Sequence, residues 1–248
     1  MSICDPSFIY VPETASTNTC LKALNRQQIL KEGTVVYTSN QVSGRGQVGT
    51  SWESEPGKNL TFSIILFPQK IPVNRQFILS QLVSLAVRDV LSEAVDFISV
   101  KWPNDIYYKN QKIAGILIEN DIEGDSISVS IMGIGLNVNQ RVFLSDAPNP
   151  VSLCQITNKE YDLQLLMQRI VDRLLFLYEE VNENRQDDII SRYKESLYRK
   201  DGYHLFSDKN GIFMATIEDI EPAGAIVLRT KEGERRKYLF KEVTLKIP

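Results

Sequence analysis

A turn follows a short strand-like segment in the sequence Lys101-Trp102-Pro103-Asn104-Asp105-Ile106, and the chain soon returns through Lys112-Ile113-Ala114-Gly115-Ile116-Leu117-Ile118-Glu119. The Pro-Asn pair is a strong turn signal, and the apolar run after Lys112 is typical of a buried strand. Such a turn can present the Asn104 amide and the Asp105 carboxylate to one cavity, which the Lys112 ammonium can also reach. A single lysine is usually a solvated surface charge. A lysine that opens a buried strand beside a polar turn instead suggests a functional site.

Working outward from this turn, the sequence alternates strand and helix patterns. Short β-rich runs predict strands at 8–11, 34–38, 60–67, 98–102, 106–108, 113–119 and 126–134. Apolar residues at helical spacing predict a helix that Thr14 or Ser16 caps and that runs through Leu21 and Leu24, and further helices over 75–95, 163–181 and 187–198. This pattern predicts an α+β fold built on a sheet.

The pattern changes after about residue 200. Asn210-Gly211 lies between two strand-like runs and is a strong hairpin signal. Further short strands are expected at 225–230, 238–240 and 243–247. We therefore expect a catalytic domain over 1–199 and a small β-barrel over 200–248.

Composition narrows the function classes. The net charge of −3 argues against a broad nucleic-acid-binding surface. Three cysteines without CxxC pairing suit a reducing compartment, and the single histidine argues against multi-histidine metal sites. No signal-peptide pattern opens the chain and no apolar run is long enough for a membrane span. We expect a soluble, cytoplasmic protein that does not bind membranes.

Residues 40–58 form a polar, glycine-rich segment that predicts a long functional loop. Within it, Gly44 and Gly46 flank Arg45, a cation suited to phosphate and carboxylate, and Trp52 closes the run. The loop lacks the Lys-Ser/Thr pair of a Walker A motif and does not open a helix as a dinucleotide fingerprint does. Alone, such a loop is weak evidence of function, and a flexible surface turn is the more ordinary interpretation.

Two shorter motifs can also line a ligand site. Gly133 and Gly135 interrupt a good strand, which indicates either close approach of a ligand or a β-bulge. Ser16, Thr17 and Asn18 have the pattern of a helix cap, although their side chains could also bind a polar ring such as a ureido group.

Taken together, these motifs resemble the biotin protein ligase family. The resemblance rests on their order and spacing: Ser16-Thr17-Asn18, Gln41 with Gly44-Arg45-Gly46, Lys101-Trp102-Pro103-Asn104-Asp105, Lys112 with Ala114-Gly115-Ile116-Leu117, and Gly133-x-Gly135-x-Asn137. It implies a mixed-sheet catalytic domain with helices on one face, of the kind shared with class II aminoacyl-tRNA synthetases, and an SH3-like C-terminal barrel.

The resemblance also implies the chemistry and the residues. ATP would activate biotin to biotinyl-5'-AMP, and the biotin would then pass to a lysine of a biotin carboxyl carrier domain. Lys112, Arg45 and Asp105 would be catalytic. Biotin would contact Ser16, Thr17, Asn18, Gln41, Gly44, Arg45, Gly46, Lys112, Gly115, Gly133 and Gly135. ATP would contact Arg45, Gln47, Trp52, Asn104 and Asn137. Mg²⁺ would arrive with ATP, near Asp105, without a site made by protein ligands alone.

Two features depart from some members of the family. Some carry further arginines in a GRGRRGR-like loop, where this chain has Gln47 and Thr50. The repressor-type members carry an N-terminal helix-turn-helix, and fifteen residues before Ser16 leave no room for one. We therefore expect no DNA binding. The sequence leaves open whether the protein is a monomer or a weak homodimer. A lipoate ligase would show an arginine-rich RRxSGGG-type loop, and a purely binding SH3-like module would leave the Lys112 motif without a role.

Overall fold

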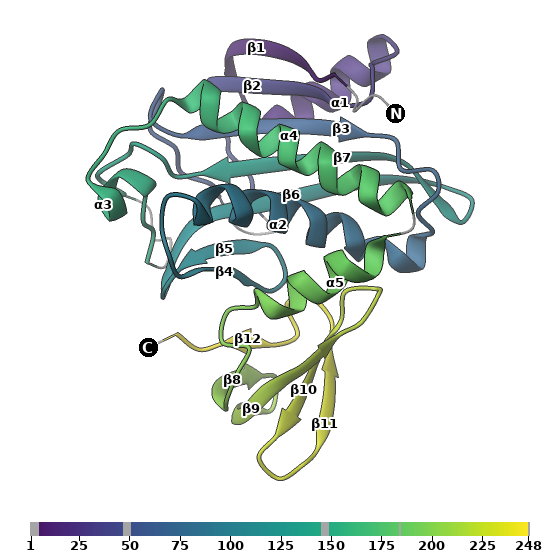
Figure 1. Ribbon diagram of the computed structural model, residues 1–248, viewed down its shortest axis with the longest axis vertical. Helices are drawn as coiled ribbons and strands as arrows, with labels where there is room; N and C mark the ends of the chain where they lie inside the picture. The colour runs from purple at the N-terminus through teal and green to yellow at the C-terminus, as the bar shows by residue number, and fades with distance from the viewer. Residues whose placement is uncertain (1–4, 47–50, 145–148, 184, 248) are drawn as a thin grey trace.

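A computed structural model describes residues 5–46, 51–144, 149–183 and 185–247. Its centre is a seven-stranded mixed sheet in the order β1-β2-β3-β7-β6-β5-β4 (Figure 1). β1 and β2 pair in parallel, and the other neighbours pair antiparallel. The strands are β1 Ser7–Thr14, β2 Thr34–Gln41, β3 Leu60–Leu66, β4 Ile98–Lys101, β5 Asp105–Tyr108, β6 Gln111–Glu123 and β7 Ser126–Leu136.

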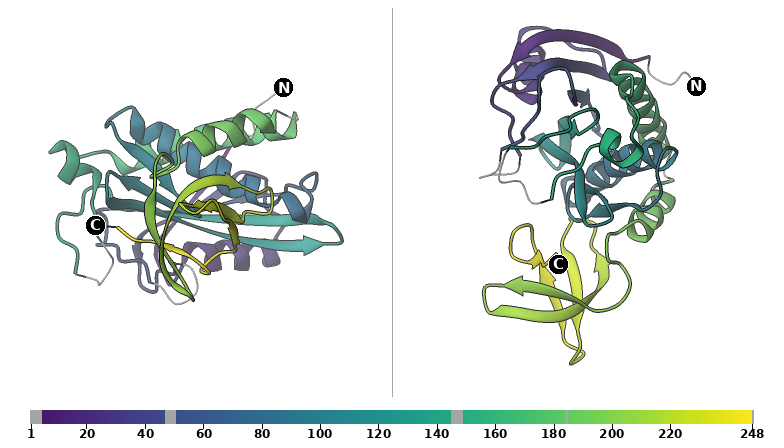
Figure 2. Two further views of the ribbon diagram at one scale, coloured as in Figure 1. Left: turned by 90° about the horizontal axis from the view of Figure 1, so that it is seen from below. Right: turned by 90° about the vertical axis from the view of Figure 1, so that its left-hand side faces the viewer.

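Helices cover both faces of this sheet (Figure 2). The long helices α2 (Phe77–Ser92) and α4 (Leu163–Asn182) pack on one face, against a core that includes Val35, Ile64 and Met132. The short helix α1 (Thr17–Gln27) packs on the opposite face through Leu21. The expectation that the helices lie on one face of the sheet is thus correct for α2 and α4. It is wrong for α1, which lies on the opposite face. The reason is topological: α1 joins the parallel strands β1 and β2, and such a crossover must leave the plane of the sheet.

The remaining helices are short. A 3-10 turn, η1 (Val73–Arg75), precedes α2, and α5 (Gln186–Glu195) follows α4. A short helix, α3 (Leu153–Thr157), begins with a capping box formed by Ser152 and Gln155. The sequence pattern did not predict α3, because five residues are too few to display a helical period. No helix in the described part of the chain is both long and apolar enough to cross a membrane.

The C-terminal segment forms a second, five-stranded antiparallel sheet in the order β11-β10-β9-β8-β12. This separate β unit below the main sheet confirms the expected α+β class (Figures 1 and 2). Its strands are β8 His204–Asp208, β9 Gly211–Ile220, β10 Ile226–Thr230, β11 Arg235–Tyr238 and β12 Thr244–Leu245.

Trp102 links the two sheets. Its indole Nε1 donates to the Gly224 carbonyl oxygen at 2.9 Å, and its ring meets the Phe240 ring at 5.4 Å between centroids. Phe77 of α2 also meets Phe240, at 5.9 Å. Gly224 has φ +98°, and a Cβ there would lie 2.7 Å from the Phe77 ring. The turn after Lys101 is therefore packed against turns of the C-terminal segment that carry Gly224 and Phe240.

Candidate active site

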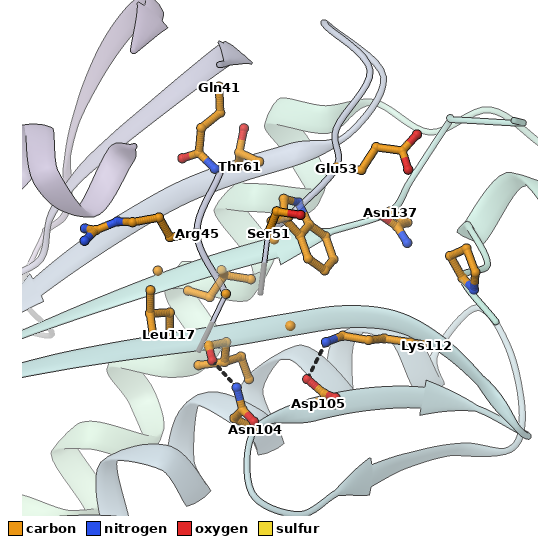
Figure 3. A pocket seen from close by; sticks show the side chains of 18 of the residues that line it. Gln41, Arg45, Ser51, Glu53, Thr61, Asn104, Asp105, Lys112, Leu117 and Asn137 are labelled. Atoms are coloured by element: carbon orange, nitrogen blue, oxygen red, sulfur yellow. Dashed lines mark hydrogen bonds and ion pairs between the residues drawn. The ribbon is translucent and has the colours of Figure 1, made fainter. Parts of the chain in front are cut away.

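A cavity of about 640 Å³ opens on the α1 side of the main sheet, between the start of α1, residues 45–46 and 51–53, and strands β2 to β7 (Figure 3). Such a volume suits a small-molecule ligand of substrate size. The cavity is lined by Ser16, Thr17, Asn18, Gln41, Arg45, Gly46, Ser51, Trp52, Glu53, Thr61, Lys101, Asn104, Asp105, Tyr107, Lys112, Gly115, Ile116, Leu117, Gly133, Ile134, Gly135, Asn137, Phe143 and Pro150. The fold thus brings together motifs that lie up to 134 residues apart in the sequence, from Ser16 to Pro150.

The first turn of α1 forms a neutral polar wall at one end. Gln41, the last residue of β2, accepts a hydrogen bond from the Thr17 backbone N–H at 2.9 Å. Its amide oxygen is thereby occupied, which leaves the NH₂ group to donate to a ligand. Ser16 is the N-cap residue, but its side chain makes no capping hydrogen bond. Ser16 therefore occupies the N-cap position of α1, as the motif predicted, but its hydroxyl does not cap the helix.

A buried hydroxyl from β3 fixes the same wall. Ser63 Oγ lies 2.6 Å from both Thr17 Oγ1 and Asn18 Oδ1, and Ser63 is fully buried. The Asn18 NH₂ group donates to Glu119 Oε2 at 2.8 Å and to the Leu117 carbonyl, which fixes the amide orientation. Because Asn18 Oδ1 can then only accept, Ser63 donates to it. Sequence reasoning missed Ser63 and Glu119. The available signal was a serine inside the apolar run 60–67.

The strand glycines leave space for side chains that cross the cavity. A Cβ on Gly133 would lie 2.3 Å from Asn18 Oδ1, and one on Gly135 would lie 2.4 Å from the Trp52 ring. Both glycines occupy regular pairs, since the β6–β7 register shifts only between Asp121 and Ile122. The bulge alternative is therefore wrong at these positions. The glycines permit close approach, first of protein side chains and then of a ligand in the adjoining cavity.

The far end of the cavity is ionic. Lys112 Nζ lies 2.6 Å from Asp105 Oδ1, and both side chains are partly buried (Figure 3). Asn104 holds the turn to β6, because its Nδ2 donates to the Ile116 carbonyl at 2.6 Å and its own carbonyl accepts from the Ile116 N–H. The turn and the returning strand therefore bring the amide, the carboxylate and the ammonium to one cavity, as the sequence predicted.

A second lysine faces this end. Lys101 lines the cavity, and its Nζ lies 3.3 Å from the Tyr107 hydroxyl. Burial lowers the pKa of Lys101, and neighbouring Lys112 lowers it further while Asp105 opposes both. The Tyr107 hydroxyl has a raised pKa, first through burial and then through Asp105 and Tyr198, so it stays neutral. Sequence reasoning quoted Lys101 within its motif without giving it a role.

Arg45 is turned away from Lys112. Its guanidinium donates to Thr19 Oγ1 at 2.9 Å and lies 3.7 Å from Glu119 Oε1 (Figure 3). Gly44 accepts from the Trp52 backbone N–H, and a Cβ on Gly44 would lie 2.4 Å from the Trp52 carbonyl oxygen. Gly44 therefore holds the base of the loop closed without lining the cavity, whereas Gly46 lines it. Gln47 and Thr50 lie outside the described residues.

Trp52 and Asn137 supply buried polar atoms to the cavity. Trp52 Nε1 and Asn137 Oδ1 are buried and have no hydrogen-bond partner among the described residues. Asn137 Nδ2 donates to the Val151 carbonyl at 3.1 Å, so the amide oxygen is the atom left for a ligand. Buried polar groups are normally paired, and such orphans in a cavity suit a ligand that completes them.

Carboxylates near the cavity have protein partners. Glu53 accepts from the Leu144 N–H and from Gln140, which ties the 51–55 segment to the chain after β7. Within the described part of the chain, no three His, Cys, Asp or Glu side chains gather as a metal site would require. Asp105 also lines the cavity, and its partner is Lys112.

Comparison with known proteins agrees with this geometry. Residues 10–137 match the model of the Biotin/lipoate A/B protein ligase family, and the chain belongs to this family. A solved biotin protein ligase from Aquifex aeolicus, in complex with biotin and ATP, superposes with a TM-score of 0.80 at 25% identity, covering 98% of this chain and 99% of that one.

Curated relatives point the same way. The bifunctional ligase/repressor BirA of Bacillus subtilis is 31% identical over 217 residues, covering 84% of this chain and 65% of that protein. The biotin–[acetyl-CoA-carboxylase] ligase of Mycobacterium tuberculosis is 29% identical over 168 residues, covering 66% of this chain and 61% of that protein. The matched region thus spans somewhat less than two thirds of these relatives.

Proposed function

We propose that this protein is an ATP-dependent biotin protein ligase. It would convert biotin and ATP to biotinyl-5'-AMP and pyrophosphate, and then transfer biotin to a lysine of a biotin carboxyl carrier domain. The observation that carries the proposal is the polarity of one cavity: a neutral, hydrogen-bonded wall at Thr17 and Gln41, and a Lys112–Asp105 ion pair at the other end. The names of the Aquifex aeolicus and Mycobacterium tuberculosis relatives support it.

The neutral wall suits the uncharged ureido ring of biotin. That ring offers one carbonyl acceptor and two N–H donors, which Gln41, Ser16 and Thr17 can satisfy. Asn18 would support these residues from behind through Ser63. The valeryl chain would then run over the Gly133, Gly135 and Gly115 backbone toward Lys112, past Trp52.

The ionic end suits the meeting of two anions. The biotin carboxylate must approach the α-phosphate of ATP, and the Lys112 ammonium would offset their repulsion. Arg45 would leave Glu119 and contact the carboxylate and phosphate, and Gly46 and Gln47 would cover the adenylate. Asn104, Trp52 and Asn137 would hold the nucleotide. Mg²⁺ bound to the ATP phosphates, near Asp105, would help pyrophosphate to leave.

The second step needs an uncharged acceptor amine, whose ordinary pKa is about 10.4. Asp105 would position that amine or accept its proton once the adenylate holds Lys112. In this proposal residues 1–199 carry the chemistry, and residues 200–248 pack beneath the Trp102 turn. The acceptor domain is the partner, in the cytoplasm, and the enzyme acts as a monomer or weak homodimer. The net charge of −3 supports a protein acceptor over DNA.

The test is incorporation of labelled biotin into a recombinant carboxyl carrier domain, in the presence of ATP and Mg²⁺. We expect label on the acceptor lysine and none on a carrier domain with that lysine changed to arginine. Labelled lipoate, in a parallel reaction with a lipoyl domain, should give no product. Lipoate transfer without biotin transfer would overturn the assignment.

A further inference from the structure

Lys101 occupies a different place in the cavity from Lys112. It ends β4, whereas Lys112 lies near the start of β6. The Lys101 and Asp105 Cα atoms are paired across the β4–β5 hairpin, so both side chains project from the same face of the sheet. Its ammonium therefore reaches the same cavity from one strand further out than Asp105.

The sheet order gives the cavity a direction. Ser63, which fixes the polar wall, belongs to β3, two strands from β6 on one side, and β4 lies two strands from β6 on the other. Neighbouring strands are about 4.8 Å apart, so each interval is about 10 Å. A ligand that runs from the wall to Lys112 therefore points onward toward Lys101.

The geometry of an in-line displacement at phosphorus determines which group lies on the Lys101 side. In phosphoryl transfer the attacking and leaving oxygens are roughly collinear at phosphorus. If the biotin carboxylate attacks from the β3 side, the leaving oxygen departs toward β5 and β4. Adenosine, held at Trp52 and Asn137, branches to the side of that line.

Among the cavity cations, Lys101 is the one best placed by its charge pairing to bind the leaving group. Lys112 is paired with Asp105 at 2.6 Å, and Arg45 lies 3.7 Å from Glu119. Lys101 has no carboxylate within 4.0 Å among the described residues, and its contact is the neutral Tyr107 hydroxyl at 3.3 Å. A partly buried ammonium whose direct contact is a neutral hydroxyl is a favourable site for a highly charged anion.

We propose that Lys101 is a catalytic residue that binds the β- and γ-phosphates of ATP and holds the departing pyrophosphate. In the step, a biotin carboxylate oxygen forms a bond to the α-phosphorus. The bond from the α-phosphorus to the bridging oxygen breaks, and pyrophosphate leaves with the electron pair beside the Lys101 ammonium. This inference deepens the proposed function and rests on it.

The experiment is biotin-dependent exchange of labelled pyrophosphate into ATP, which reports adenylation and its reversal. The unaltered protein is measured first, and absence of exchange there would count against the proposed function itself. In Lys101→Gln, the KM values for pyrophosphate and ATP should rise about 10- to 100-fold, the range for loss of a charge-assisted hydrogen bond. The KM for biotin should stay within about twofold.

A second readout separates this role from a structural one. Lys101→Gln, given chemically prepared biotinyl-adenylate, should biotinylate the acceptor domain at the normal rate, because pyrophosphate takes no part in transfer. Lys109→Gln is the matched control: Lys109 is exposed in the β5–β6 turn and does not line the cavity. That variant should match the unaltered protein in both assays.

Lys101→Arg tests the charge directly and remains informative if Lys101→Gln folds poorly. Burial lowers the lysine pKa, so its ammonium loses its proton as pH rises through that value, and the KM for pyrophosphate should rise there. Arginine stays charged, so Lys101→Arg should give a flat alkaline profile. A normal pyrophosphate KM in Lys101→Gln, an equal loss in the transfer assay, or identical pH profiles would overturn the inference.

Discussion

The two ends of the cavity are stabilised differently. At the α1 end, neutral groups from three elements saturate one another, as when Ser63 joins Thr17 and Asn18. At the β4–β6 end the groups are charged and already paired: Asp105 lies 2.6 Å from Lys112. The third cavity charge, Arg45, lies beside α1, 3.7 Å from Glu119. The neutral end is arranged for recognition before any ligand arrives. At the ionic end, Lys112 has to leave its contact with Asp105 before it can bind the ligand.

The largest expected effect falls on the ionic end. Lys112→Ala should fold and lose adenylation by about 100-fold or more, because it removes positive charge where two anions meet and leaves Asp105 facing them. Biotin-dependent pyrophosphate release is the measurement. Lys109→Ala, which removes an exposed lysine outside the cavity, should keep its rate. Near-normal turnover in Lys112→Ala would contradict the assignment.

Gly133→Ala tests the neutral end by crowding. The new methyl group would meet Asn18 Oδ1 at 2.3 Å and break its contact with Ser63. Overpacking of this kind costs about 1–3 kcal/mol in the free energy of unfolding. Calorimetric melting and biotin affinity should both decline. Gly115→Ala is the comparison, because its nearest neighbours, the Trp52 ring and the Lys112 side chain, lie farther away, at 3.2–3.3 Å, and it should destabilise less. Equal losses would show that Asn18 can move.

Ser63→Ala separates recognition from chemistry. Asn18 Oδ1 and Thr17 would lose a shared buried partner, which costs about 1–3 kcal/mol. We expect a rise of about tenfold in the Kd for biotin, measured by titration calorimetry, with little change in the KM for ATP. Ser128→Ala, which removes an exposed β7 hydroxyl, is the control. An ATP defect equal to the biotin defect would mean that the two ends are not independent.

The smallest effect concerns Gln47, whose placement lies outside the described residues. An arginine there could give the adenylate phosphate a charge-assisted hydrogen bond, about twice as strong as that of glutamine. Gln47→Arg should therefore slow release of labelled biotinyl-adenylate by up to about tenfold in a chase with unlabelled biotin. Equal release rates would show that position 47 does not face the phosphate.

Prediction from sequence succeeded where a local pattern carried the information. The turn at Asn104 and Asp105 returns at once into the Lys112 strand, so hydrogen-bonded pairing of β5 with β6 brings these groups together. The glycines of β7 were recognised from an interrupted strand. Ser63 and Glu119 were missed because each acts across strands, and nothing next to them in the chain marks their partners.

The sequence by itself determined the α+β class, the motifs and the lysine beside a polar turn, because periodicity and turn chemistry are properties of neighbouring residues. Tertiary structure alone decided that α1 crosses to the face opposite α2, that Asp105 neutralises Lys112, and that Arg45 lies against Glu119. The place of α1 depends on strand order, and the Arg45–Glu119 contact joins residues 74 positions apart. The Asp105–Lys112 ion pair forms only once β5 has paired with β6. Their free energies come from packing and desolvation in the assembled fold, which no short stretch of the chain encodes.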